Sequence, residues 1–119
     1  MESFNRATDN SVVSFTLVNA DTDSDVRILS DGDVINFKLL GTNKINVRAN
    51  TKPMRVYDLQ FSYDNGILKH ASYPYTFKGN NLWDFKGWTP KPGNHVLTAT
   101  AYKDKVGSSM KIHFSVVGK

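Results

Sequence analysis

The chain has 119 residues and a mass of 13.4 kDa, the size of a single domain. Apolar residues make up 39% and charged residues 22%, which favours a folded globule. No apolar run approaches the ~20 residues of a membrane-spanning helix. The absence of cysteine excludes disulfides and thiolate metal sites. The net charge is +4, with nine acidic and seven basic residues in 1–64 but two acidic and eight basic residues in 65–119. The basic half contains no arginine, the residue that base recognition favours, so we expect no nucleic-acid partner.

Residues 1–10 form a polar lead-in without the basic cluster and apolar run of a signal peptide, so we expect a lead-in at 1–10 and a domain at 11–119. The strands then follow a period of two, which is typical of strands with one buried face. At 109–117, for example, Met110, Ile112 and Phe114 alternate with Lys111 and His113. The same analysis predicts the other strands at 12–20, 34–40, 44–50, 57–63 and 96–102.

Turn-forming residues separate these strands. Asp31-Gly32 and Asn65-Gly66 predict tight hairpins, residues 41–43 and 104–108 predict further turns, and the Pro90–Asn94 segment predicts a loop. Seven or eight short strands without an amphipathic helix indicate an all-β antiparallel sandwich, with an up-and-down barrel as the alternative.

Six segments in order carry a family resemblance. They are Val13–Asp23 (VSFTLVNADTD), Asp31–Ile35 (DGDVI), Ile45–Ala49 (INVRA), Tyr73–Tyr75 with Lys78–Asn80, Trp88-x-Pro90 with Gly93–Tyr102, and Ile112–Val116 (IHFSV). Together they resemble an immunoglobulin-like domain of bacterial secreted and cell-surface proteins. The resemblance implies an immunoglobulin-like sandwich that is one unit of a longer extracellular chain, beside glycan-active or adhesive domains. It transfers no catalytic or ligand residue, and Lys69–Ser72 and Gly79-Asn80 depart from the family pattern.

An aromatic cluster at residues 73–88 is the first candidate site. Exposed Trp and Tyr rings stack on the apolar faces of sugars, amides bond their hydroxyls, and flanking lysines favour anionic sugars. The predicted ligand-binding residues are Trp83, Tyr73, Trp88, Asn80 and Asn81, flanked by Lys78, Lys86 and Lys91. The competing interpretation is core packing, because such sandwiches bury a Trp between their sheets. The family resemblance implies that Tyr75 and Trp88 are structural in this way, whereas Trp83 lies among polar residues and is the better candidate for an exposed platform.

Asp21, Asp23 and Asp25 have the one-three-five spacing of a calcium loop, so they are candidate calcium ligands. The sixth position is Val26 instead of Gly and the twelfth is Gly32 instead of Glu, so the EF-hand pattern is incomplete. A solvated turn is the alternative, and we expect no other cofactor.

Catalytic patterns are weak. The three histidines, His70, His95 and His113, fall on different predicted strands, and no pair of carboxylates has a glycosidase signature. We therefore expect a non-catalytic module of a secreted or cell-surface protein that serves in adhesion or as a spacer, with glycan or protein ligands and neighbouring domains as partners and no membrane insertion. The alternative is a carbohydrate-binding module that uses the aromatics of 73–88.

Overall fold

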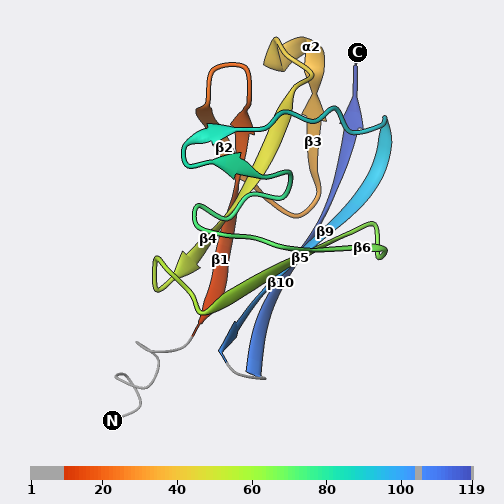
Figure 1. Cartoon of the computed structure of the whole chain (residues 1–119). Helices are drawn as coiled ribbons and strands as arrows, with labels where there is room; N and C mark the ends of the chain where they lie inside the picture. The colour runs from red at the N-terminus through yellow and green to blue at the C-terminus, as the bar shows by residue number, and fades with distance from the viewer. Residues whose placement is uncertain (1–9, 104–105, 119) are drawn as a thin grey trace.

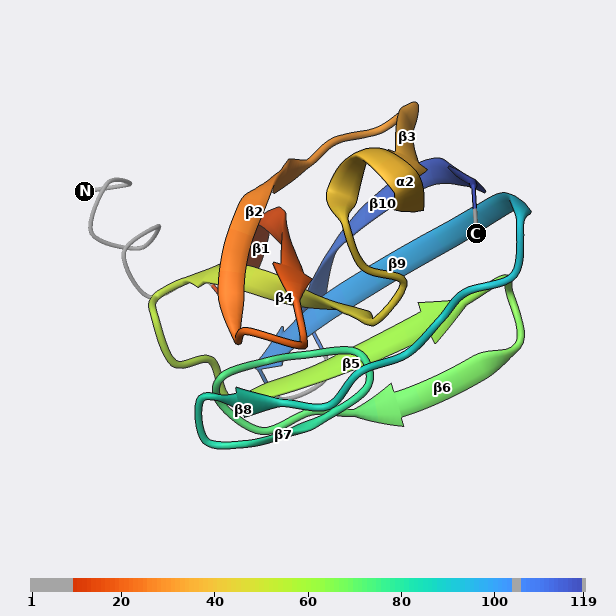
Figure 2. The same ribbon diagram turned by 90° about the horizontal axis from the view of Figure 1, so that it is seen from above.

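Alternating apolar side chains build two packed sheets in the computed structural model, which describes residues 10–103 and 106–118. Figures 1 and 2 show the two layers. The first sheet has the order β2-β1-β4, made of β1 (Ser11–Asn19), β2 (Ser24–Leu29) and β4 (Ile45–Lys52). The second has the order β3-β10-β9-β5-β6, made of β3 (Asp33–Asn36), β5 (Asp58–Tyr63), β6 (Ile67–His70), β9 (Gly93–Lys103) and β10 (Val106–Val117). The remaining elements are a one-turn helix, α2 (Phe37–Leu40), and a small hairpin of β7 (Asn80–Asn81) and β8 (Asp84–Phe85).

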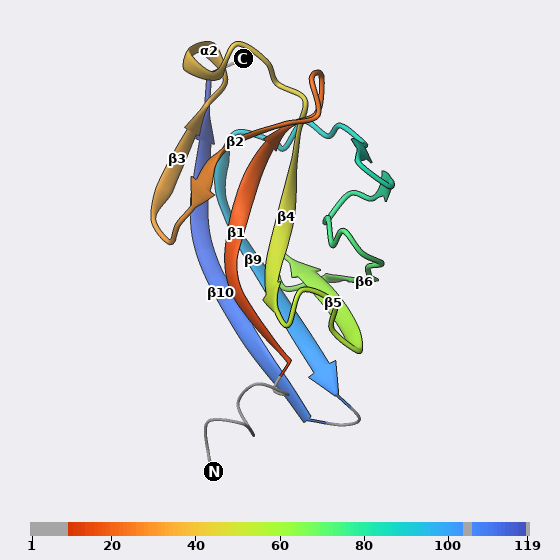
Figure 3. The same ribbon diagram turned by 90° about the vertical axis from the view of Figure 1, so that its left-hand side faces the viewer.

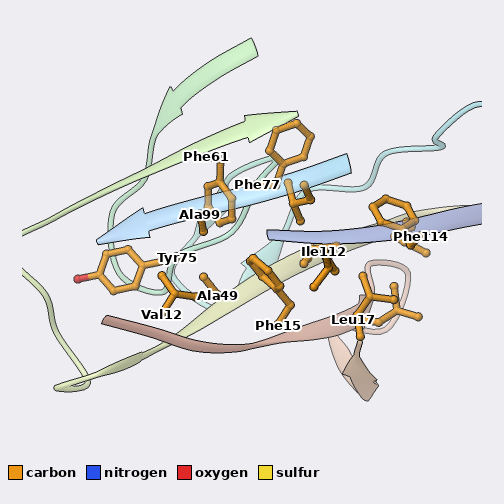
Figure 4. Packing of buried hydrophobic residues seen from close by; sticks show 14 of the residues in the cluster. Val12, Phe15, Leu17, Ala49, Phe61, Tyr75, Phe77, Ala99, Ile112 and Phe114 are labelled. Atoms are coloured by element: carbon orange, nitrogen blue, oxygen red, sulfur yellow. The ribbon is translucent and has the colours of Figure 1, made fainter. Parts of the chain in front are cut away.

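The core lies between the two sheets, and Figure 4 shows its side chains meeting there. In β10, Ile112 and Phe114 are buried while Lys111 and His113 are exposed, as the alternation predicts. Facing residues from the other sheet complete the core, among them Phe15, Leu17, Val47 and Ala49. Burying such side chains contributes roughly 1.5–3 kcal/mol each, so this interface is the main source of stability.

The chain passes between the sheets as immunoglobulin-like sandwiches do. After β4 it crosses to form β5 and β6, returns beside β4 near Thr76, and crosses again to form β9 and β10. The predicted fold class, an all-β immunoglobulin-like sandwich, is confirmed. One detail differs from the purely antiparallel expectation: β3 runs parallel to β10, with Val34 opposite Ser115.

The hairpin predicted at Asp31-Gly32 does not form. This turn carries the chain from one sheet to the other, because β2 pairs with β1 whereas β3 pairs with β10. Gly32 has a φ of 88°, but Asp31 lacks the positive φ that a type I′ turn needs at both central positions. The Gly32 amide instead donates to the His113 carbonyl at 2.6 Å.

The strand predicted at 34–40 is half strand and half helix. Its second half is α2, because the Asn36 side chain accepts hydrogen bonds from the amides of Lys38 and Leu39 and caps the turn. Gly41, with a φ of 82°, ends it in the left-handed conformation. Leu39 is consequently exposed instead of facing the core.

The hairpin predicted near Asn65-Gly66 forms between β5 and β6, but its turn is centred one residue earlier. Asp64 and Asn65 take φ values of 50° and 60°, and the Gly66 amide donates to the Tyr63 carbonyl at 3.0 Å, which is a type I′ pattern. Tyr57, expected on the inner face of this strand, precedes β5 and is 74% exposed.

The sandwich is elongated, with extents of 50 × 26 × 23 Å. Figures 1 and 3 show that β1 begins at one end and β10 finishes at the other. Within the described residues, no helix has the length and apolar character needed to cross a bilayer. Residues 1–9 of the predicted lead-in, and 104–105 of the predicted last turn, lie outside the described part.

Candidate functional site

The aromatic segment at residues 73–88 runs along the free edge of β4. The Ala49 amide donates to the Tyr75 carbonyl at 2.7 Å, and the Phe77 amide donates to the Val47 carbonyl at 2.9 Å. Farther along, the amides and carbonyls of Ile45 and Trp88 exchange two hydrogen bonds of 2.9 Å. The segment therefore extends the first sheet as an irregular edge, and β7 and β8 project from it (Figure 2).

The buried side-chain amide of Asn46 forms hydrogen bonds to both ends of this projecting hairpin. Its Nδ2 donates to the carbonyls of Gly79 and Lys86 at 3.0 Å each, and its Oδ1 accepts from the Lys78 amide at 3.0 Å. Its Oδ1 also accepts from the Val47 amide at 2.8 Å. A fully buried amide with all these bonds made holds the hairpin in one position on β4.

The hairpin tip presents Trp83, whose surface is 52% exposed. Its ring lies perpendicular to those of Tyr73 and Phe85, with centroids 5.9 and 5.8 Å away. The Arg48 guanidinium carbon is 5.7 Å from the Trp83 centroid. Tyr73 is less free, because the Arg55 guanidinium carbon lies 4.2 Å from its ring centroid. Trp83 is thus held by its neighbours and remains open to solvent.

An open groove of about 320 Å³ lies between Trp83 and β4. Its walls combine aromatic and aliphatic surface with cationic and amide groups, which come from Arg48, Asn50, Lys52, Met54, Tyr73 and Trp83. Arg48 is fixed in place, because its two terminal nitrogens donate to the Asp25 carboxylate at 2.9 Å each. Such a groove can accept an extended ligand with an apolar face and polar edges.

The five predicted ligand residues divide into three groups. Trp83 and Tyr73 meet in the groove. Trp88 packs on the core instead, with its ring 5.3 Å from Tyr63 and 5.2 Å from Phe77. The Asn80 side chain is used in local bonds, accepting from Thr76 Oγ1 at 2.7 Å and donating to the Leu82 carbonyl at 2.8 Å, while Asn81 is exposed on β7.

Sequence reasoning missed the β4 side of this groove. Arg48 and Asn50 occupy the polar positions of an alternating strand, which predict only a solvated face. Lys52 and Met54 follow at its end. Nothing local signals that a segment some thirty residues later lies over them.

The three candidate calcium ligands do not converge. The Asp21 carboxylate accepts from Thr42 Oγ1, that of Asp23 accepts from the Phe85 amide at 2.8 Å, and that of Asp25 pairs with Arg48. In residues 10–103 and 106–118, no three His, Cys, Asp or Glu side chains are grouped to hold a metal ion. The hydrogen bond from Arg48 holds the pKa of Asp25 below its usual value. The geometry therefore gives the calcium hypothesis no support.

Each histidine pairs its Nδ1 with a different aspartate, and the three pairs are separate from one another. His70 lies 3.1 Å from Asp58, and His113 lies 3.1 Å from Asp31. His95 is buried, lies 2.9 Å from Asp64, and stacks on the Tyr63 ring at 5.3 Å. Hydrogen bonds from the His113 amide and then its side chain lower the pKa of Asp31.

Burial, and secondarily the charge of Asp64, raises the pKa of the Tyr63 hydroxyl. The structure gives this hydroxyl no hydrogen-bond partner among the described residues. Tyr63 packs within a ring cluster with Phe77, Trp88 and His95. This surrounding is that of a core residue and not of a catalytic acid or base.

Three solved structures are similar to this chain at low sequence identity. An engineered protein has a TM-score of 0.50 and 14% identity, covering 73% of this chain and 18% of its own. The endo-beta-1,4-mannanase from Thermotoga petrophila has a TM-score of 0.44 and 13% identity, covering 99% and 22%. The fibronectin(III)-like modules of Clostridium thermocellum CbhA have a TM-score of 0.41 and 15% identity, covering 92% and 98%.

This chain therefore spans about a fifth of the length of the first two of these proteins. At such identities the likeness concerns the fold and carries no activity. No protein-family model matches the sequence, and no curated protein matches it.

Proposed function

We propose that this domain is a non-catalytic module of a longer secreted or cell-surface protein, where it holds neighbouring domains at a fixed separation and takes part in adhesion. The observation that carries the proposal is the placement of the first and last strands. The start of β1 and the end of β10 lie at opposite ends of a sandwich 50 Å long, so domains joined to these two strands would be held apart in line. Paired sheets around a close-packed core resist bending, which suits a spacer.

Two marker domains test the positioning role. With a fluorescent protein joined by a short linker to each end, small-angle scattering should give two separated masses. Their separation should exceed the 50 Å length of the sandwich and stay unchanged between low and high salt. Markers that fold back on the sandwich, or a separation that varies with salt, would contradict a rigid spacer.

The groove beside Trp83 supports a second candidate function, binding of a glycan chain. A half-exposed indole offers an apolar face for a sugar ring, and Arg48, which is held by Asp25, and Lys52 supply polar groups along the groove. The groove follows the free edge of β4 as far as Lys52, which pairs with Ser11 at the start of β1, so a bound ligand would lie beside the end of the sandwich where β1 begins.

A titration of intrinsic tryptophan fluorescence with a panel of oligosaccharides tests this candidate. A binding sugar should quench or shift the emission of the wild-type chain, and Trp83→Ala should abolish the change while the domain stays folded. Leu82→Ala is the matched control, since Leu82 is exposed on the same tip but does not line the groove. Equal binding by wild type and Trp83→Ala would rule out the groove.

A further inference from the structure

Three lysines gather beside the base of the β7–β8 hairpin, away from the Trp83 groove. The ammonium nitrogens of Lys69 and Lys78 each lie 5.5 Å from the centroid of one ring, that of Phe77. Lys78 is also 5.9 Å from the Trp88 centroid. Lys86 joins them from the returning arm of the hairpin, where its amide donates to the Gly79 carbonyl at 3.0 Å. None of the three lines the Trp83 groove.

The fold fixes these lysines close together. Asn46 binds the Lys78 amide and the Lys86 carbonyl, so a single buried side chain positions the backbone of both residues. Lys69 comes from the neighbouring edge strand, β6. Residues that are 9 and 17 positions apart in the sequence thereby form one cationic surface, which we call the lysine cluster: Lys69, Lys78 and Lys86.

Among the described residues, no carboxylate forms an ion pair with the lysine cluster. The ion pairs found across residues 10–103 and 106–118 involve Arg27, Arg48 and the histidines, and none contains a lysine. Burial, and then the positive charges of Lys78 and Lys86, lower the pKa of the Lys69 ammonium. A bound anion would offset the repulsion between the three ammonium groups, so the lysine cluster favours negatively charged ligands.

We propose that the lysine cluster binds the sulfate or carboxylate groups of an acidic polysaccharide. Three point charges on neighbouring backbone segments match an anionic chain better than a single small ion. The exposed surface here lacks what single-stranded nucleic acids use, since Phe77 is buried, Trp88 is packed against the core, and residues 65–119 contain no arginine. The site is independent of Trp83, so it stands or fails apart from the groove.

The test measures binding of the full chain to dextran sulfate, with neutral dextran of equal length as the reference. The variant Lys69→Gln, Lys78→Gln, Lys86→Gln keeps a shorter polar side chain at each position and removes three charges. The matched control, Lys38→Gln, Lys91→Gln, Lys111→Gln, removes the same charge from exposed lysines elsewhere. Thermal unfolding of each variant verifies folding.

We expect the cluster variant to weaken dextran sulfate binding at least tenfold, and to reduce the slope of log affinity against log salt by about two. The control should weaken it less than threefold, and neutral dextran should not bind. In the wild-type chain, saturation with dextran sulfate should raise the pKa of the Lys69 ammonium group. An NMR titration of the Lys69 side chain, with and without dextran sulfate, measures this pKa. This last readout does not depend on any variant folding.

Four outcomes would overturn the proposal. They are absence of dextran sulfate binding, equal weakening by both variants, tighter binding of a single-stranded oligonucleotide of equal charge, and full competition by inorganic sulfate at equal sulfate concentration. The second would indicate attraction by net charge alone, the third a nucleic-acid surface, and the fourth a site for a small anion.

Discussion

The side chain of Asn46, on β4, and the backbone of Gly79, 33 positions later, are joined by a 3.0 Å hydrogen bond at the edge of the first sheet. With the bonds to Lys78 and Lys86, this contact decides where the β7–β8 hairpin lies on β4. The Trp83 groove and the lysine cluster both depend on that position. A residue that contacts no ligand therefore supports both candidate binding surfaces.

Replacing this residue should cost much of the domain's stability. Asn46→Ala leaves the Lys78 amide and two carbonyls without their partner in a buried place, so we expect a loss of about 2–4 kcal/mol in the free energy of unfolding. Urea unfolding measures it, with Asn81→Ala as the control, because Asn81 is exposed on the hairpin itself. A loss below about 0.5 kcal/mol for Asn46→Ala would show that the hairpin is held by other contacts.

The centre of the core should be equally sensitive to lost volume. Phe61 is fully buried and packs edge-on against Phe77 at 5.8 Å. Phe61→Ala should cost about 3–5 kcal/mol, and the milder Phe61→Leu about 1–2 kcal/mol, which keeps the measurement possible if the first variant unfolds. Leu68→Ala on the neighbouring strand β6 should change stability by less than about 0.5 kcal/mol, because Leu68 is exposed. Similar losses at both sites would be inconsistent with the burial seen here.

The pair between Arg48 and Asp25 should make stability depend on acid pH. Because the folded pKa of Asp25 lies below its ordinary value of 3.8, the pair stabilises the fold above that value, and the benefit is lost as the pH falls through the lower folded pKa. Asp25→Asn should therefore lower the free energy of unfolding at pH 7, by at most about 1 kcal/mol because Asp25 is largely exposed, and by progressively less as the pH falls below the ordinary pKa of the carboxyl group.

Urea midpoints of wild type and variant between pH 2 and 7 provide the measurement. The control is Asp84→Asn, which removes an exposed carboxylate of β8 that forms no ion pair within the described residues. A difference between wild type and Asp25→Asn that persists undiminished at pH 2 would contradict the pairing.

Most strands of the sandwich can be predicted from the sequence, because a strand with one buried face alternates apolar and polar residues. Ile112, Phe114 and Val116 are predicted and found in the core. The segment at 34–40 is not readable in this way, since capping by Asn36 and Gly41 overrides its β-like apolar residues. The Asp31-Gly32 turn fails as a hairpin signal because its local chemistry does not say which sheet the next strand joins.

The sequence predicts only part of the candidate site, namely its aromatic side. The polar surroundings of Trp83 predict its exposure, and the family resemblance at Trp88-x-Pro90 implies a structural role for Trp88. Arg48 and Lys52 could not be assigned, because their role depends on a contact across some thirty residues. Asn46 could not be assigned either, since an asparagine at a polar position of a strand normally predicts exposure, whereas here the returning segment buries it.

The contrast between the two tryptophans gives the most direct test of the whole arrangement, since the chain has only these two. Trp88→Phe reports on Trp83 alone and Trp83→Phe on Trp88 alone, and acrylamide quenches each indole according to its access to solvent. We expect strong quenching of Trp83 and at least threefold weaker quenching of Trp88. Equal quenching of the two, or stronger quenching of Trp88, would contradict a sandwich that shields Trp88 and displays Trp83.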